Sequence, residues 1–127
     1  MRKLKVILFC VFAMTILCLQ AKGVKRMTAV ERRTAILDMA TEKIAEFEGF
    51  RSTVYKCSAK KLTIGYGFTD ADLVRKGTIT KTEAKRILWR KCAAILDMIM
   101  SEITVPLTVG QTAALVSFTY NVGDAAF

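Results

Sequence analysis

The segment FEGFRSTVYKCSAKKLTIGYGFT, residues 47–69, contains an acid, a thiol and a hydroxyl at Glu48, Cys57 and Thr63. Hydrolysis of a glycosidic bond needs an acid that protonates the leaving oxygen and a second group that positions water or stabilises the oxocarbenium-like transition state. Glu48 suits the first role, and the other two side chains are candidates for the second. A single glutamate at a helix end is usually only a solvated charge, so the surrounding residues decide between these interpretations.

The 127-residue chain contains no histidine. This excludes a histidine-bound zinc site, a Ser-His-Asp triad and a Cys-His protease. Any catalysis therefore uses carboxylates, hydroxyls or thiols, and we expect neither a metal nor another cofactor.

A helix that begins at Thr28 and ends near Glu48 is predicted to position the acid. TAVE at 28–31 is a capping box, and Gly49 favours termination. The apolar residues spaced to form its buried face are Val30, Leu37, Ala40, Ile44 and Phe47.

The next residues, 52–68, alternate with a period of two, which predicts an antiparallel hairpin that turns through SAKK at 58–61. Such a hairpin brings Cys57 and Thr63 together across the turn, with the helix end beside them. Gly65 and Gly67 are expected to leave one face of the second strand bare, where another chain can approach.

Two further helices are expected after a loop that holds Asp70, Asp72 and Gly77. TKTE at 80–83 is a second capping box and begins a helix through about Glu102, which Pro106 closes. TVGQ then caps a helix at 112–122 that is apolar nearly all round and is predicted to run through the core. The fold class is α+β and mainly helical, in a single domain.

The segment 47–69 resembles the active-site segment of the phage-type lysozymes, glycoside hydrolase family 24. In that family a Glu is followed nine residues later by Asp or Cys, and six residues after that by Thr, which are the spacings of Glu48, Cys57 and Thr63. The blocks EGFR, VYK, TIGYG, KGTITKTEAKRIL and LTVGQTAALVSFTYNVG resemble the family in the same order. The resemblance covers residues 44–127, and five blocks in the same order make a chance match very improbable.

This resemblance implies an endolysin that hydrolyses β-1,4 bonds between N-acetylmuramic acid and N-acetylglucosamine in bacterial peptidoglycan. Glu48 would be the general acid, and Cys57 and Thr63 would flank the water or sugar on the opposite side. Phe118 matches a family position near the substrate cleft, although an aromatic residue in a core helix usually serves packing. The implied fold is lysozyme-like: a small lobe of helix and β-hairpin, joined by a long helix to a helical lobe, in a protein of prophage origin.

Two departures from the family accompany these matches. Phe68 stands where many relatives have histidine, which removes any polar role there. Family members usually continue into further helices, so we expect the lysozyme-like domain at 22–127 to lack its C-terminal helices, to leave the helical lobe incomplete and to expose an apolar patch on the helix at 112–122.

The role of the Cys57 thiol stays open between thiolate nucleophile, water-orienting group, structural thiol and disulfide partner. Cys92 is expected to be a core thiol, although it could pair with Cys57 in an oxidising compartment. If the N-terminus stays in the membrane, Cys10 or Cys18 could exchange disulfides with Cys57 and hold the enzyme inactive until release.

Residues 1–21 combine a basic start, an apolar run at 6–19 and a small residue at Ala21, as export signals do. The first expectation is cleavage after Ala21. The second is that the segment stays as an anchor, with transient inner-membrane association through residues 6–19. The third is that the protein starts at Met27 and is cytoplasmic. We thus expect an exported, periplasmic or secreted protein, or one anchored in the membrane before release.

The net charge of +9 favours an anionic partner, and peptidoglycan with its attached polymers is anionic. Basic residues are scattered, without a nucleic-acid-binding motif, so no nucleic acid is expected, and we expect a monomer. Two alternatives remain: an inactive relative that only binds the cell wall, and a membrane-active protein that uses the basic helix at 28–47. The acidic residues of that helix argue against the second.

Overall fold

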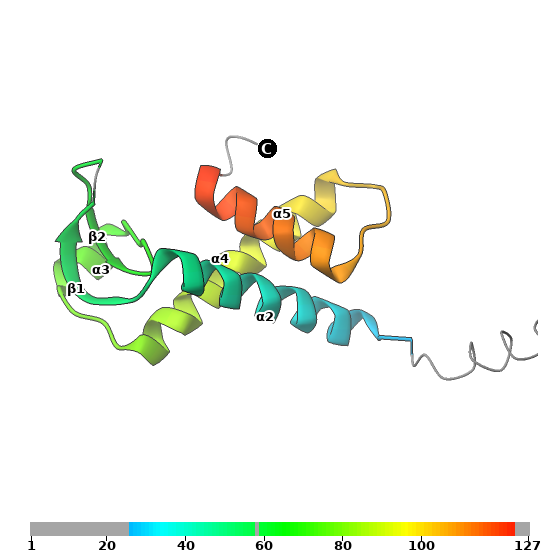
Figure 1. Ribbon diagram of the computed structural model, residues 1–127, viewed down its shortest axis with the longest axis horizontal. Helices are drawn as coiled ribbons and strands as arrows, with labels where there is room; N and C mark the ends of the chain where they lie inside the picture. Colours follow the sequence, from blue (N-terminus) through cyan, green and yellow to red (C-terminus); the bar gives the residue numbers. More distant parts are fainter. Residues whose placement is uncertain (1–25, 58, 124–127) are drawn as a thin grey trace, which may run out of the picture.

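The computed structural model describes residues 26–57 and 59–123, so the proposed signal at 1–21 and its cysteines lie outside the described residues. Figure 1 shows the β-hairpin and a short helix at one end, the last helix at the other, and two long helices running between them. The elements in chain order are α2 (Ala29–Glu48), β1 (Arg51–Lys56), β2 (Leu62–Gly65), α3 (Ala71–Lys76), α4 (Lys81–Glu102) and α5 (Val109–Val122). The mainly helical α+β class is confirmed.

Helix α2 begins with the predicted capping box, in which the Thr28 hydroxyl accepts from the Glu31 amide and the Glu31 carboxylate accepts from the Thr28 amide. Its buried face comprises Ile36, Leu37, Ala40, Thr41 and Ile44. The prediction that Val30 and Phe47 belong to this face is wrong, since they are 74% and 77% exposed. Helical spacing identifies a face but does not tell how far along it the neighbouring helices reach.

Strands β1 and β2 form the predicted antiparallel hairpin, in which Tyr55 pairs with Thr63 and Lys56 with Leu62. Lys60 adopts a left-handed conformation in the turn, with φ of 61°. The second strand ends at Gly65 rather than at residue 68. Ile64 and Phe68 exchange both backbone hydrogen bonds, at 2.9 and 2.8 Å, so the chain reverses direction over residues 65–67.

The two glycines of this reversal do not leave a bare face, which corrects the sequence prediction. Both have positive φ, 67° at Gly65 and 83° at Gly67. A Cβ atom on Gly65 would lie 2.8 Å from the Phe68 ring, and one on Gly67 would lie 3.1 Å from Oε2 of Glu48. Phe68 of the reversed chain fills the space beside Gly65, and Glu48 of α2 fills the space beside Gly67.

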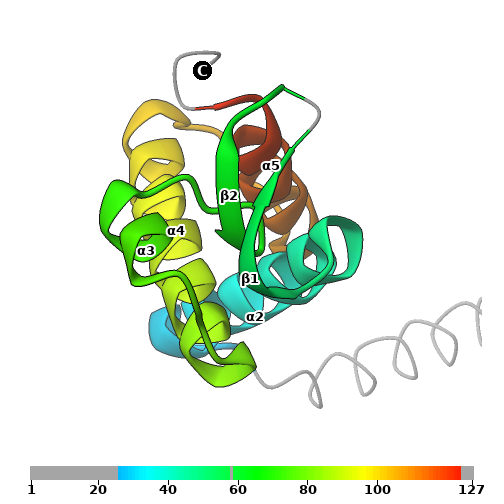
Figure 2. The same ribbon diagram turned by 90° about the vertical axis from the view of Figure 1, so that its left-hand side faces the viewer.

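The segment predicted as a loop at 70–77 contains helix α3, which ends at Gly77 in the left-handed conformation with φ of 80°. It lies beside α4 (Figure 2), and Lys76 pairs with Glu83 at 2.8 Å. Because Glu83 pairs with Lys76, the second capping box is only half formed: Thr80 accepts from the Glu83 amide, but no return bond is made.

The hydrophobic core lies between α2, α4, α5 and the hairpin. Its buried residues on α4 and α5 are Ala84, Leu88, Cys92, Leu96, Ile99, Ala113 and Val116. Helix α5 is buried on one side only, because Phe118 and Val122 are 56% and 48% exposed. The prediction of a fully buried core helix is therefore wrong for its outer face, where the expected apolar patch is present.

Helices of the described segments 26–57 and 59–123 do not reach the combination of length and apolarity that spanning a bilayer requires.

Candidate active site

Glu48 is the last residue of α2, and the chain leaves the helix at Gly49 with φ of 67°. Its side chain points to the reversal after β2, as the close approach of Oε2 to Gly67 shows. The residue is exposed, and within the described residues no hydrogen bond or ion pair engages its carboxylate. The Glu48 carboxylate thus lies against the backbone at Gly67 without a polar partner among the described residues. It is therefore available to bind a ligand.

The carboxylate opens onto a groove of about 660 Å³ between α2 and α5. Phe118 lines the groove from α5, and Phe47 lines it from α2. The remaining lining residues are Met39, Lys43, Gly110, Ala113, Ala114, Ser117 and Asn121. Glu48 and Phe118, which the sequence proposed for catalysis and substrate binding, therefore share one apolar groove.

Tyr120 joins α5 to the glycine-marked reversal. Its hydroxyl donates a 2.7 Å hydrogen bond to the backbone carbonyl of Tyr66, next to Gly67. Burial raises the pKa of the Tyr120 hydroxyl, and the negative charge of Glu48 adds to that rise. The sequence does not reveal this role of Tyr120, because inside an apolar helical run a tyrosine gives no sign of where its hydroxyl will bind.

Cys57 and Thr63 meet across the hairpin, as predicted. A hydrogen bond from the Thr63 hydroxyl holds the pKa of the Cys57 thiol below its usual range, and the Lys61 backbone contributes less. The Thr63 hydroxyl is also 3.1 Å from the Lys61 carbonyl, to which it donates. The hydroxyl has a single proton to donate. When Cys57 is a thiol, the proton goes to the Lys61 carbonyl, and when Cys57 is a thiolate, the hydroxyl can rotate and donate to the sulfur.

The four residues thus fall into two pairs. Glu48 at the end of α2 and Phe118 on α5 line the groove, whereas Cys57 and the buried Thr63 lie toward the turn of the hairpin and do not line it. Cys57 is partly exposed, whereas Cys92 is fully buried in the core, and both are free thiols. Burial raises the pKa of the Cys92 thiol. A disulfide between these two cysteines, one of the open alternatives, is therefore not formed.

No group of three or more histidine, cysteine, aspartate or glutamate side chains in the described part of the chain is arranged to hold a metal ion.

Comparison with known proteins agrees with this architecture. An endolysin of Acyrthosiphon pisum secondary endosymbiont phage 1 is 36% identical over 84 residues, which cover 66% of this chain and 57% of the relative. An endolysin from Escherichia coli O157:H7 phage FAHEc1 superposes with a TM-score of 0.63 at 30% identity, over 82% of this chain and 62% of that one. The muramidase domain of SpmX from Asticaccaulis excentricus superposes with a TM-score of 0.60 at 33% identity, over 68% of this chain and 58% of that one.

The chain spans less than two thirds of the length of each of these proteins. The family model of the phage lysozymes matches residues 45–127, which include Glu48, both hairpin strands, α4 and α5. By this match over more than half of its length, the chain belongs to the phage lysozyme family.

Proposed function

We propose that this protein is a lysozyme that hydrolyses the β-1,4 bonds between N-acetylmuramic acid and N-acetylglucosamine in bacterial peptidoglycan. The observation that carries the proposal is an exposed, unpaired Glu48 at the edge of a groove shared with Phe118, in a chain of the phage lysozyme family. The names of the relatives, endolysin and muramidase domain, support the same activity.

In this proposal Glu48 is the general acid. Its proton passes to the glycosidic oxygen, the bond from that oxygen to the anomeric carbon breaks, and the sugar alcohol leaves. Water then adds to the anomeric carbon and gives up a proton. We assign Cys57 and Thr63 to this water because they match the family pattern that also contains Glu48. The lowered pKa of Cys57 enlarges the thiolate fraction that can accept the proton, and the thiol then releases it to solvent. Solvent returns a proton to Glu48.

The chain's charge suits this substrate. A net charge of +9 attracts the chain to a wall rich in carboxylates. The attraction raises the local concentration of substrate but does not orient it, so specificity has to come from the groove.

The deciding experiment measures release of reducing sugars and loss of turbidity from purified murein. Glu48→Gln is expected to lower the rate by at least roughly 100-fold, since general acid catalysis typically contributes that much. Glu46→Gln is the matched control: it removes an exposed carboxylate two residues earlier, paired with Lys43 at 3.0 Å, and should leave the rate unchanged. Equal rates for wild type and Glu48→Gln would refute the mechanism. Murein binding without release of reducing sugars would establish instead a protein that only binds the wall.

Export is the route that we propose to this substrate, through the segment at 1–21, which lies outside the described residues. Fusion of residues 1–21 to a phosphatase that is active only after export tests it. Phosphatase activity is expected outside the cytoplasm, either released or held at the inner membrane, and activity absent from both fractions contradicts export.

A further inference from the structure

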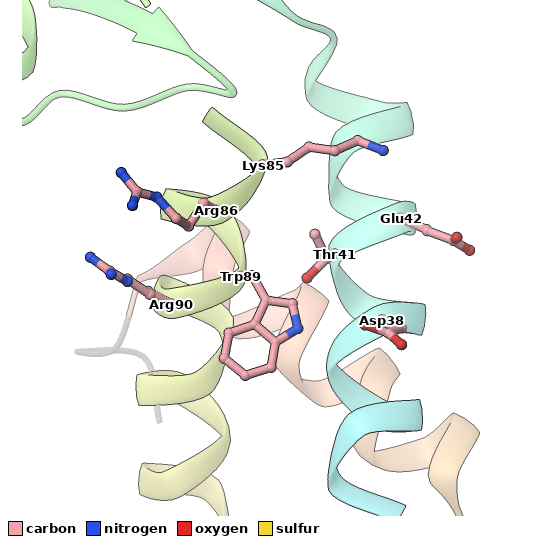
Figure 3. Close-up of a pocket in the computed structure, with 7 residues that line it drawn as sticks. All are labelled: Asp38, Thr41, Glu42, Lys85, Arg86, Trp89 and Arg90. Atoms are coloured by element: carbon pink, nitrogen blue, oxygen red, sulfur yellow. The ribbon is translucent and has the colours of Figure 1, made fainter. Parts of the chain in front are cut away.

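A second groove, of about 550 Å³, lies between α2 and α4. Residues on an α-helix advance by about 100° each, so Asp38 and Glu42 on α2 share one face, roughly 100° or more away from Lys43 and Phe47 in the active-site groove. The two grooves therefore lie on different sides of α2. Figure 3 shows the residues that line the second one: Asp38, Thr41, Glu42, Lys85, Arg86, Trp89 and Arg90. We call it the Trp89 groove.

The only tryptophan of the chain lies across this groove, with 38% of its surface exposed. A large aromatic ring that is left open to solvent beside a hollow offers a flat surface on which a ligand can pack. In Figure 3 the indole lies between the two helices, and its nitrogen faces α2.

Thr41 lies beside this ring and has an unsatisfied hydroxyl. The residue is only 8% exposed, and its Oγ1 has no hydrogen-bond partner. Burial raises the pKa of the nearby Cys92 thiol, and the Thr41 hydroxyl, which can donate to the sulfur, opposes that rise. Sulfur is a weak acceptor, and no hydrogen bond of normal geometry joins the two side chains. Buried hydroxyls are normally bonded, so an unbonded one that lines a groove is a place where a polar ligand gains a bond.

Charged side chains stand on both rims of the groove. Lys85 extends from α4 toward α2, Arg86 and Arg90 extend to the outer side of α4, and Asp38 and Glu42 extend from α2, with Glu42 on its outer side (Figure 3). Within the described residues none of these five makes a hydrogen bond or an ion pair. Elsewhere on the surface, by contrast, Arg33 pairs with Asp97 and Lys91 with Asp70. The rims thus present separated charges of both signs that can bind ionic groups, although Arg86 also attracts Glu83.

We propose that the Trp89 groove is a second binding site for peptidoglycan and takes its stem peptides, a proposal that rests on the lysozyme function above. These peptides contain carboxylates and, on their diamino acid, a free ammonium group. The carboxylates bind the α4 rim at Arg86 and Arg90, the ammonium binds the α2 rim, and the aliphatic portion packs on Trp89. Binding the peptide here holds the enzyme to the wall while the active-site groove binds the glycan.

The mixed charge distinguishes this ligand from two other wall components. A phosphate-rich polymer would be attracted to α4 but repelled by Asp38 and Glu42 on the opposite rim. A neutral sugar would pack on the indole and would make no use of the charge of either rim. Only a ligand that carries both signs of charge satisfies both rims.

The sole tryptophan reports directly on occupancy, so the test is titration of the full-length protein with a synthetic stem peptide while indole fluorescence is recorded. We expect a saturable change whose midpoint moves to higher peptide concentration as salt rises. Chitooligosaccharide and polyphosphate serve as the two competing probes. A change produced by either probe and not by the peptide overturns the proposal, as does a peptide titration with no saturable change.

Variants that retain the indole test the rims separately. Arg86→Gln with Arg90→Gln should weaken peptide binding by about tenfold or more, the loss expected for a hydrogen bond to a charged group. Asp38→Asn with Glu42→Gln should weaken it too. Arg75→Gln, an exposed arginine on α3 outside the groove, should leave binding unchanged. Equal binding by wild type and both double variants would show that the groove does not recognise charge and would overturn the proposal.

This outcome is separable from that of the hydrolysis assay. Glu48→Gln should bind the stem peptide as wild type does, because it lies outside the Trp89 groove. A protein that cleaves murein but gives no peptide signal refutes the second site alone. A protein that binds the peptide but does not cleave murein refutes the enzymatic proposal alone.

Discussion

The carboxylate of Glu48 and the backbone of Gly67 face each other so closely that a single added carbon would disturb them. A Cβ atom on Gly67 would lie 3.1 Å from Oε2 of Glu48, and the glycine itself has φ of 83°. This contact sets the end of α2 against the reversal that follows β2. The glycine of the GYG sequence therefore leaves room for the candidate acid.

Gly67→Ala should for this reason reduce murein hydrolysis by more than its effect on stability explains. The alanine is strained by about 1–2 kcal/mol in the left-handed region and also pushes on the carboxylate. Gly77→Ala is the matched control, since Gly77 has φ of 80° and a Cβ atom added there would meet nothing within 4 Å. We expect similar losses of melting temperature in the two variants and a fall in activity only in Gly67→Ala. Comparable activities would mean that the contact with Glu48 has no role.

Tyr120→Phe should destabilise the protein by about 1 kcal/mol, because the Tyr66 carbonyl loses its 2.7 Å hydrogen bond from the Tyr120 hydroxyl. Urea unfolding followed by circular dichroism measures this change. Tyr55→Phe removes a hydroxyl for which the described residues supply no hydrogen bond, and it should change stability little. If the two variants unfold at the same urea concentration, the bond contributes nothing measurable.

Thr63→Val should raise the pKa of Cys57, because it removes the hydroxyl that stabilises the thiolate. The pH profile of Cys57 alkylation by iodoacetamide should then shift to higher pH, since only the thiolate reacts. Peptide-resolved mass spectrometry separates this thiol from the others, and buried Cys92 should react slowly in both proteins. An unchanged profile would show that Thr63 does not act on the thiol.

Phe118→Ala should raise the KM for murein several-fold and leave the melting temperature nearly unchanged, because Phe118 is 56% exposed in the groove. Val116→Ala gives the opposite pattern as a control. Val116 is fully buried on the same helix, and the truncation should cost about 2 kcal/mol through lost burial and a new cavity. A large loss of stability in Phe118→Ala would assign that ring to packing.

The sequence predicted helices and strands well where interactions between residues close together in the chain determine them. Hydrogen bonds between residues three apart in sequence fix the starts of α2 and α5, so their capping boxes were visible in the sequence. The hairpin and the meeting of Cys57 with Thr63 followed from alternation and a short turn. Helix α3 was missed because six residues carry too little periodicity, and the Lys76–Glu83 pair that replaces a capping bond depends on how α3 lies beside α4.

By itself the sequence determined the fold class, the place of Glu48 at a helix end and the family to which the chain belongs. Only the tertiary structure decided that Glu48 lies against Gly67 and shares a groove with Phe118, and that Tyr120 bonds to Tyr66. It also decided that Thr41 and Trp89 border one hollow. These relationships join residues that are far apart in the chain, and the packing angles of the helices set them. No local periodicity encodes which exposed side chains those angles bring together.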